Sequence, residues 1–122
     1  MFPPIFAVCS TDPGVIALLG ANPDTRLYSF GEAPEDTIKP YAVWQLISGD
    51  PENYLAGRPD ADGFSLQVDA YATTGTAARN IAKAIRDAIE LKAYVTSWNG
   101  ESRDTETKLY RYSFDVDWIV LR

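Results

Sequence analysis

The sequence predicts an α+β domain in which an antiparallel sheet of four to five strands carries a kinked N-terminal helix and one central helix on the same face. Hydrophobic and polar residues alternate along residues 64–71, which is typical of a strand with one buried face and one solvated face. Ile81, Ile85 and Ile89 recur at every fourth position within residues 77–91, which predicts an amphipathic helix lying across that buried face. The whole chain of 122 residues has the length of one domain.

Both predicted helices carry recognisable end signals. Residues 3–19 are predicted to be helical with a break, because Asp12 followed by proline is a typical start of a new helix. Gly20 is expected to end this kinked helix, or pair of short helices, as a left-handed cap. The hydroxyl of Thr74 or Thr76 is expected to cap the amino end of the central helix.

Five segments carry strand signals. They are residues 26–30, 41–48, 64–71, 94–99 and 107–121. In the last of them, the side chains at even positions from Tyr110 to Val120 are expected to face the core, opposite a polar row. The strand at 41–48 is apolar on both faces, so we expect it to be central or to meet another molecule. Residues 99–104 begin with Asn-Gly, which predicts a hairpin tip.

Composition narrows the possible functions. The formal net charge of −6 argues against a nucleic-acid-binding surface, because phosphate contacts need clustered Lys and Arg. The chain has no histidine, which removes Ser-His-Asp and Cys-His catalytic arrangements and the commonest zinc ligand sets. Cys9 is the only cysteine and has apolar neighbours, so we expect a buried, unreactive thiol. Without a signal peptide or a long apolar run, the sequence predicts a soluble protein made in a cytoplasm.

Two acidic pairs are candidates for chemistry. Asp115 and Asp117 lie two positions apart on one strand face, where they form a divalent-metal or acid–base pair, or simply the solvated face of the strand. Asp60 and Asp62 resemble the start of a calcium loop, but the further ligands and the terminal glutamate of such a loop do not follow. We therefore expect no cofactor and no metal. An enzyme that uses Asp115 and Asp117 is an alternative that metal-dependent stabilisation would favour.

Several segments together resemble one protein family over essentially the whole chain. The N-terminal helical region ends in DPGVIALLG, and a Pro-rich loop leads to the strand KPYAVWQLISG. The strand GFSLQVDAYATTG then runs into the helix ARNIAKAIRDAIEL, and the aromatic strand KLYRYSFDVDWIVLR closes the chain. In this order the segments resemble the tail completion family of long-tailed phages, also called the tail terminator family.

The resemblance implies a structural protein of the virion without catalytic residues. Such proteins form a ring, usually of six subunits, on the head-proximal end of the tail tube. They stop tube growth and provide the surface that docks to the head. The implied partners are copies of the same chain, the major tail tube protein and the head-completion or connector protein, with DNA only passing through the lumen and no membrane. The implied location is the virion tail, after assembly in the cytoplasm of the bacterial host.

We expect the assembly contacts to come from the loops at 31–40 and 50–62 and from exposed sheet surface, because long loops in a small domain are usually functional or disordered. The candidate interface residues are Glu32, Pro34, Glu35, Tyr41, Val43, Tyr54, Arg58 and Trp98. An acidic lumen would repel DNA phosphates, and the candidates for its lining are Glu32, Glu35, Asp36, Asp50 and Glu52. The other alternative is a non-catalytic binding or assembly module unrelated to tails, which a closed apolar pocket and a monomer in solution would favour.

Overall fold

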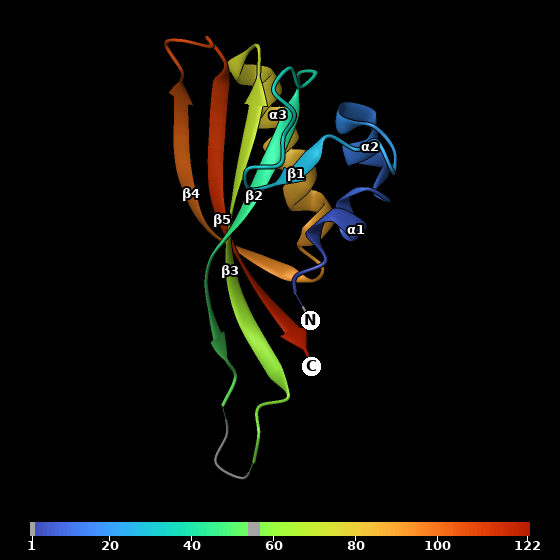
Figure 1. Ribbon diagram of the computed structural model, residues 1–122, viewed down its shortest axis with the longest axis vertical. Coiled ribbons are helices and arrows are strands. Elements are labelled where there is room, and N and C mark those ends of the chain that lie inside the picture. Colours follow the sequence, from blue (N-terminus) through green and yellow to red (C-terminus); the bar gives the residue numbers. More distant parts are fainter. Residues whose placement is uncertain (1, 54–56) are drawn as a thin grey trace.

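The structure, a computed structural model, describes residues 2–53 and 57–122. It confirms the α+β class, because within those ranges three helices lie on one side of a five-stranded sheet (Figure 1). The helices gather over one half of the sheet, and the strands continue past them into a narrow extension. Tyr54, a candidate interface residue, lies outside the described residues.

The elements follow one another in the predicted order. The helices are α1 (Ile5–Cys9), α2 (Pro13–Leu19) and α3 (Gly75–Ile89). The strands are β1 (Leu27–Ser29), β2 (Tyr41–Pro51), β3 (Ala61–Ala72), β4 (Ala93–Arg103) and β5 (Tyr110–Leu121). Each described helix is too short or too polar to cross a lipid bilayer.

The sheet has the strand order β1-β2-β3-β5-β4 and is mixed, which corrects the prediction of a wholly antiparallel sheet. The other neighbouring strands pair antiparallel, but β1 pairs with β2 in parallel, with Leu27 opposite Ala42 and Ser29 opposite Trp44. The reason is the connection at residues 30–40, which carries the chain back to the end of the sheet where β1 began. A tight hairpin turn at this place would have made the pair antiparallel.

The hairpin of β2 and β3 is longer than the sequence indicates. The sequence predicts a loop across residues 49–62, whereas β2 continues to Pro51 and β3 begins at Ala61. The two strands stay paired through this stretch, so the glycine and proline that suggest a loop belong to the ladder. Proline is tolerated there because, within the described chain, β1 covers only residues 42–44 of β2 and leaves the rest of its outer edge unpaired.

The predicted hairpin tip at residues 99–104 is wrong. β4 continues to Arg103, and the tip is the turn that follows, where the Asp104 carboxylate accepts a hydrogen bond from the N–H of Glu106 at 2.8 Å. Gly100 has a φ of +96° and sits at a β-bulge, where the register against β5 shifts. Asn-Gly favours positive φ, and a bulge can require that conformation just as a turn does. A second register shift interrupts β4 near its beginning.

The N-terminal helical region is two short helices. Asp12 caps α2 by accepting a hydrogen bond from the N–H of Val15 at 3.1 Å, as predicted. Gly20 ends α2 with φ 93° and ψ 165°, so the positive φ expected of a glycine cap is present, but ψ lies outside the left-handed helical region. Thr74 caps α3 through a hydrogen bond of 3.1 Å from the N–H of Ala77, so the helix begins at residue 75 and not at 77.

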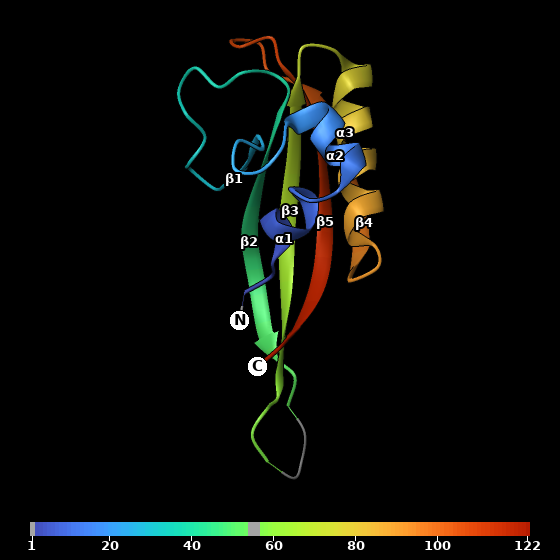
Figure 2. The ribbon, with the colours of Figure 1, turned by 90° about the vertical axis from the view of Figure 1, so that its right-hand side faces the viewer.

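The core lies between α3 and the facing sides of β3 and β5. Ile81, Ile85 and Ile89 are at most 1% exposed, which confirms the predicted apolar stripe. Phe114 and Val116 of β5 are fully buried in the same cluster. Figure 2 shows α3 along one side of the sheet, with α1 and α2 beside it. Together the three helices cover the part of the sheet that holds this cluster.

Replacing Ile85 with Asp should unfold the protein. The side chain is fully buried among apolar groups, so the variant would place an unpaired charge in the core at a cost of more than about 4 kcal/mol. Circular dichroism during heating should show no cooperative transition, or one at a far lower temperature. Asn80→Asp adds the same charge on the exposed side of α3 and should keep the transition. A stable Ile85→Asp variant would contradict this packing.

The thiol of Cys9 should be unreactive towards thiol reagents in the folded protein. The side chain is fully buried, and burial, with a smaller contribution from the charge of Asp12, raises the pKa of the thiol to about 12. The reactive thiolate is therefore scarce at pH 8. A chromogenic thiol reagent should label the protein slowly at that pH and rapidly after denaturant is added. Equal labelling rates with and without denaturant would show that the site is accessible.

Candidate assembly surfaces

The sheet extends beyond the helices as an arm built from the ends of β2, β3 and β5 (Figure 1). We define the arm as residues 46–51, 61–64 and 119–121. Leu46 is 41% exposed and Ile47 is 45% exposed, and Ile119 is exposed as well. Ile47 lies at a register shift in β2, so alternation does not fix its face. Leu46 pairs with buried Leu66 and lies on the helix side, whereas Ile119 continues the polar row of β5 on the opposite face, so the arm is apolar on both sides. Exposed apolar groups of this kind indicate a surface that another molecule covers.

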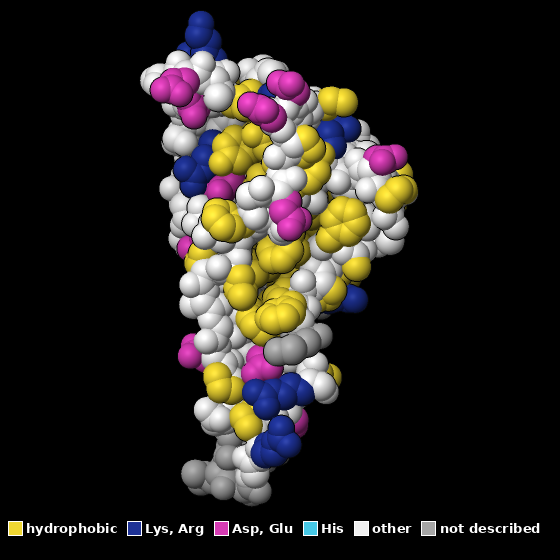
Figure 3. Space-filling model, viewed as in Figure 1, with side chains coloured by type: hydrophobic (Ala, Val, Ile, Leu, Met, Phe, Trp, Pro, Cys, Tyr) yellow, Lys and Arg dark blue, Asp and Glu magenta, His cyan; other side chains and the backbone are white. Residues whose placement is uncertain are grey.

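A hollow of about 740 Å³ lies on the arm. Apolar groups line much of it, chiefly Leu46, Pro51 and Phe64. The rings of Phe2 and Phe64 pack with their centroids 5.7 Å apart, so the N-terminal segment lies against the same surface. Figure 3 shows hydrophobic side chains gathered along the middle of this view of the molecule. The arm therefore offers an apolar surface with a definite shape.

An ion pair joins the end of β5 to the start of β3 within the arm. The guanidinium of Arg122 donates hydrogen bonds of 2.8 and 3.0 Å to the two carboxylate oxygens of Asp62, and the Arg122 N–H donates to the carbonyl of Asp60 at 2.8 Å. The hydrogen bonds from Arg122 hold the pKa of Asp62 below its usual range. The carboxylate considered for a calcium loop is thus engaged by an arginine.

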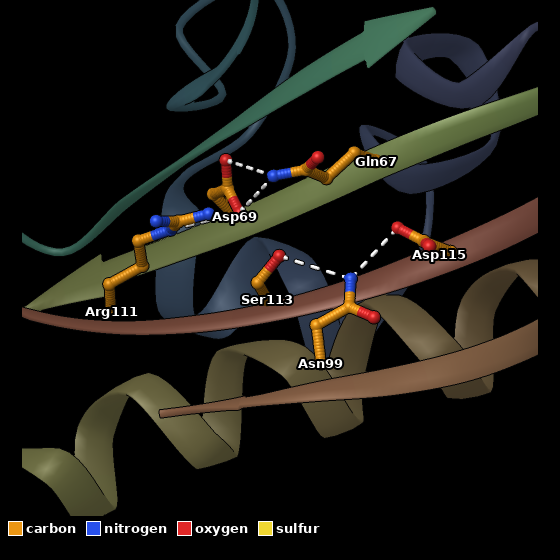
Figure 4. A network of polar contacts seen from close by, with 6 residues as sticks. All are labelled: Gln67, Asp69, Asn99, Arg111, Ser113 and Asp115. Carbon is orange, nitrogen blue, oxygen red and sulfur yellow. Dashed lines mark hydrogen bonds and ion pairs between the residues drawn. The ribbon is translucent and has the colours of Figure 1, made fainter. Parts of the chain in front are cut away.

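The face of the sheet opposite the helices, which we call the open face, carries a network of polar side chains (Figure 4). The Asp69 carboxylate accepts hydrogen bonds from the Arg111 guanidinium at 3.1 Å and from the Gln67 amide at 3.2 Å. On the next strand pair, the Asn99 amide donates to Asp115 at 2.8 Å. The network involves β3, β4 and β5, so it ties three strands together on a face without helices.

Asp115 and Asp117 have different partners. Asp115 accepts from Asn99, and Asp117 accepts from the hydroxyl of Ser65 at 2.7 Å. Among residues 2–53 and 57–122, no group of three or more His, Cys, Asp or Glu side chains is arranged to hold a metal ion. Both carboxylates act as hydrogen-bond acceptors along the polar row of β5.

Tyrosines continue the open face towards β1. The rings of Tyr41 and Tyr71 stack with their centroids 5.1 Å apart, and Tyr28 meets Tyr41 edge-on at 6.4 Å. Burial raises the pKa of both Tyr41 and Tyr71 above the usual tyrosine value. Tyr41 and Val43, two of the candidate interface residues, are half-buried here. They can therefore contribute only part of their surface to a partner.

Trp98 lies on the other side of the sheet. This candidate interface residue is partly exposed, and it sits within β4, because the strand continues through the hairpin tip expected at residues 99–104. Its ring packs against those of Phe114 and Tyr112, with centroids 5.1 and 5.7 Å away. Trp98 is thus on the helix side of the outer strand, whereas Tyr41 and Val43 lie on the open face.

The loop between β1 and β2 holds three of the candidate interface residues, Glu32, Pro34 and Glu35. All three are exposed. Two large apolar side chains of the loop are exposed as well, because Phe30 and Ile38 keep 68% and 70% of their surface in solvent. The loop therefore combines negative charge with apolar groups that the fold does not bury.

The acidic candidates for a channel lining do not form one patch. Glu32, Glu35 and Asp36 lie in the loop at one end of β2, and Asp50 and Glu52 lie at the other end of this strand of 11 residues. All of them are exposed. The two sets are separate features of the surface.

Reasoning from sequence found only part of the exposed apolar surface. The strand at 41–48, which holds Leu46 and Ile47, was expected to be central or to meet another molecule because it is apolar on both faces. Phe30 and Ile38 gave no such signal, because they flank a loop whose charge dominates its composition. Arg58, a candidate interface residue, is exposed beyond the end of β2.

The sequence profile of the family described as tail completion protein gp17 matches residues 3–121 of the chain. The chain belongs to this family. The resemblance drawn from the sequence is confirmed, and the protein is a structural protein of the phage tail and a component of the virion. Family membership removes the alternative of a module unrelated to tails.

A solved structure shares the fold. It is a chain from the virion of a native gene transfer agent (GTA) particle, with a TM-score of 0.68 and 13% sequence identity over 97% of this chain and 92% of that chain. At this identity the likeness concerns the fold alone. No curated protein sequence matches the chain. As a member of the tail completion family, the protein assembles with other proteins of the tail and head, so its uncovered surfaces are candidate contacts.

The Asp62–Arg122 pair should make the arm sensitive to acid. Because the pKa of Asp62 is lowered in the folded protein, the pair contributes stability that is present above the unfolded carboxyl pKa of about 4 and lost as the pH falls through the lower folded value. Amide exchange at residues 119–122, corrected for intrinsic rates, should accelerate modestly below pH 4. Asp62→Asn should show the same acceleration at pH 7. Asp60→Asn is the control, and equal effects of both variants would contradict a specific role for the pair.

Proposed function

We propose that the protein forms a ring, of six subunits as its family resemblance implies, on the head-proximal end of the tail tube. The ring ends the growth of the tube. Its opposite side provides the surface to which the head-completion or connector protein docks.

The arm is the observation that carries this proposal. A ring held between two layers of protein needs separate surfaces for its own neighbours and for the layers on either side. The arm projects beyond the helix-covered body and is apolar on both faces, with Leu46 exposed on one face and Ile119 on the other. Apolar surface that the fold itself does not cover is typical of obligate contacts in assemblies. The open face and the outer strands supply further surfaces that point in other directions.

DNA passes through the lumen of the proposed ring without being held. A net charge of −6 suits this role, because an acidic lining repels phosphates and offers no site where they bind. On the open face, the Arg111 guanidinium is engaged by Asp69. Asp50 and Glu52, exposed near the end of β2, are candidates for the lining, as are the acids of the loop between β1 and β2.

The subunit waits as a monomer in the host cytoplasm until the tube is present. A ring template raises the local concentration of subunits, so weak contacts between neighbours close together. Such a subunit keeps its contact surfaces free of each other until the tube aligns them.

Removing this gene from the phage or prophage that encodes it should leave heads and tails unjoined. We expect electron microscopy of lysates to show tails of irregular length and separate heads, because nothing ends tube growth or joins the two parts. A copy of the natural gene supplied in trans should restore joined particles. Tails of normal length attached to heads in the deletion strain would overturn the proposal.

Variants of the complementing copy test the arm separately. Ile47→Asp changes an exposed side chain of the arm and should fold but fail to restore joined particles. Leu91→Asp changes a more exposed side chain just beyond α3 and should restore them. Equal complementation by both variants would remove the arm from the proposed contacts.

A further inference from the structure

A groove lies between α3 and β4, at the edge of the sheet farthest from β1. It has a volume of about 410 Å³, and Trp98, Tyr112 and Lys83 are among the residues that line it. The groove exists because α3 lies mainly over β3 and β5, which leaves the helix side of the outer strand β4 largely uncovered. Aromatic rings with one open side, next to a helix, form a site for an apolar side chain.

The helix side of this groove is basic, in a protein that is acidic as a whole. Arg79 donates a hydrogen bond of 3.0 Å to Glu101 on β4, and Arg86 lies 2.8 Å from the carboxylate of Asp87. Lys83 lies between these two arginines on α3 and forms no ion pair with any described residue. The groove thus presents a positive charge that the subunit itself does not neutralise.

The loop between β1 and β2 has the complementary character. It carries the three acids named above and, on either side of them, the exposed side chains of Phe30 and Ile38. Its base is fixed, because the Arg26 guanidinium donates hydrogen bonds of 2.8 Å to the carbonyl of Pro40 and 2.9 Å to that of Leu18. The loop therefore presents apolar and acidic groups from an anchored base.

The loop cannot reach the groove of its own subunit. β1 and β4 are the two outermost strands of the sheet. Figure 2 shows the loop projecting from one side of the molecule and α3 lying along the other. A contact that joins opposite sides of identical subunits is heterologous, and it closes into a ring when the rotation between neighbours permits.

We propose that the loop between β1 and β2 of one subunit docks in the groove between α3 and β4 of the next. Phe30 and Ile38 meet the aromatic surface of Trp98 and Tyr112, and the loop carboxylates face Lys83. The apolar contact supplies affinity, while the charges set direction and register. This inference rests on the proposed ring, and it assigns the loop acids to the subunit contact in place of the channel lining.

The test is a disulfide between neighbouring copies on assembled tails. The chain would carry Ile38→Cys in the loop and Lys83→Cys in the groove, both at exposed positions, and buried Cys9 would not interfere. After mild oxidation, a non-reducing gel should show a ladder of covalent multimers that ends at the closed ring. Each single-cysteine variant should remain monomeric on the gel.

A matched control keeps the loop cysteine and moves its partner out of the groove, with Ile38→Cys and Leu91→Cys in one chain. Leu91 is exposed just beyond the end of α3, so this pair should give no ladder. One outcome is that microscopy shows rings on the tails while the variant with Ile38→Cys and Lys83→Cys gives no ladder, or no more than the control pair gives. That result would show that the proposed docking is wrong, although the proposed ring would remain supported. If tails carry no ring of this protein, the proposed function and the docking both fail.

Discussion

The packing of α3 on the sheet is the constraint on which the rest of the structure depends. Its stripe of isoleucines occupies the middle of the sheet, over β3 and β5, and α1 and α2 fill the space beside it. One layer of three short elements cannot cover strands of eleven or twelve residues along their full length. The uncovered parts are therefore fixed by the core itself: the arm beyond the helices, the outer strand β4 beside α3, and the whole open face.

The sequence predicts the parts of this fold that depend on periodic burial. Alternation predicted β3 and β5, and the four-residue spacing of isoleucines predicted α3. Asp12 was correctly identified as a cap, and Thr74 is one of the two residues expected to cap α3. What it could not give were features decided by pairing across the sheet. The parallel β1–β2 pair depends on where a loop returns the chain, and the Asn-Gly at Gly100 belongs to a bulge because β5 continues alongside it.

The candidate contacts were predictable in the same partial way. Charge and loop length pointed to Glu32 and Glu35, and a position next to the expected hairpin tip pointed to Trp98. The structure finds all of them exposed or partly exposed. The apolar residues at 46 and 47 belong to a strand that was expected to be central or to meet another molecule, but the length of the arm was not predicted, because glycine, proline and acid suggested a loop where β2 continues. Which residues lie near each other on a surface depends on the twist of the sheet, and no local sequence pattern indicates these neighbours.

The two register shifts of β4 affect how readily another strand can pair with its free edge. An outer strand of eleven residues with a regular backbone would be a template on which another extended chain could add. Each register shift breaks the even spacing of donors and acceptors along that edge and bends the strand out of line. An incoming strand finds only short stretches that match. The free edge of β4 is therefore a poor template for pairing with another copy of the chain.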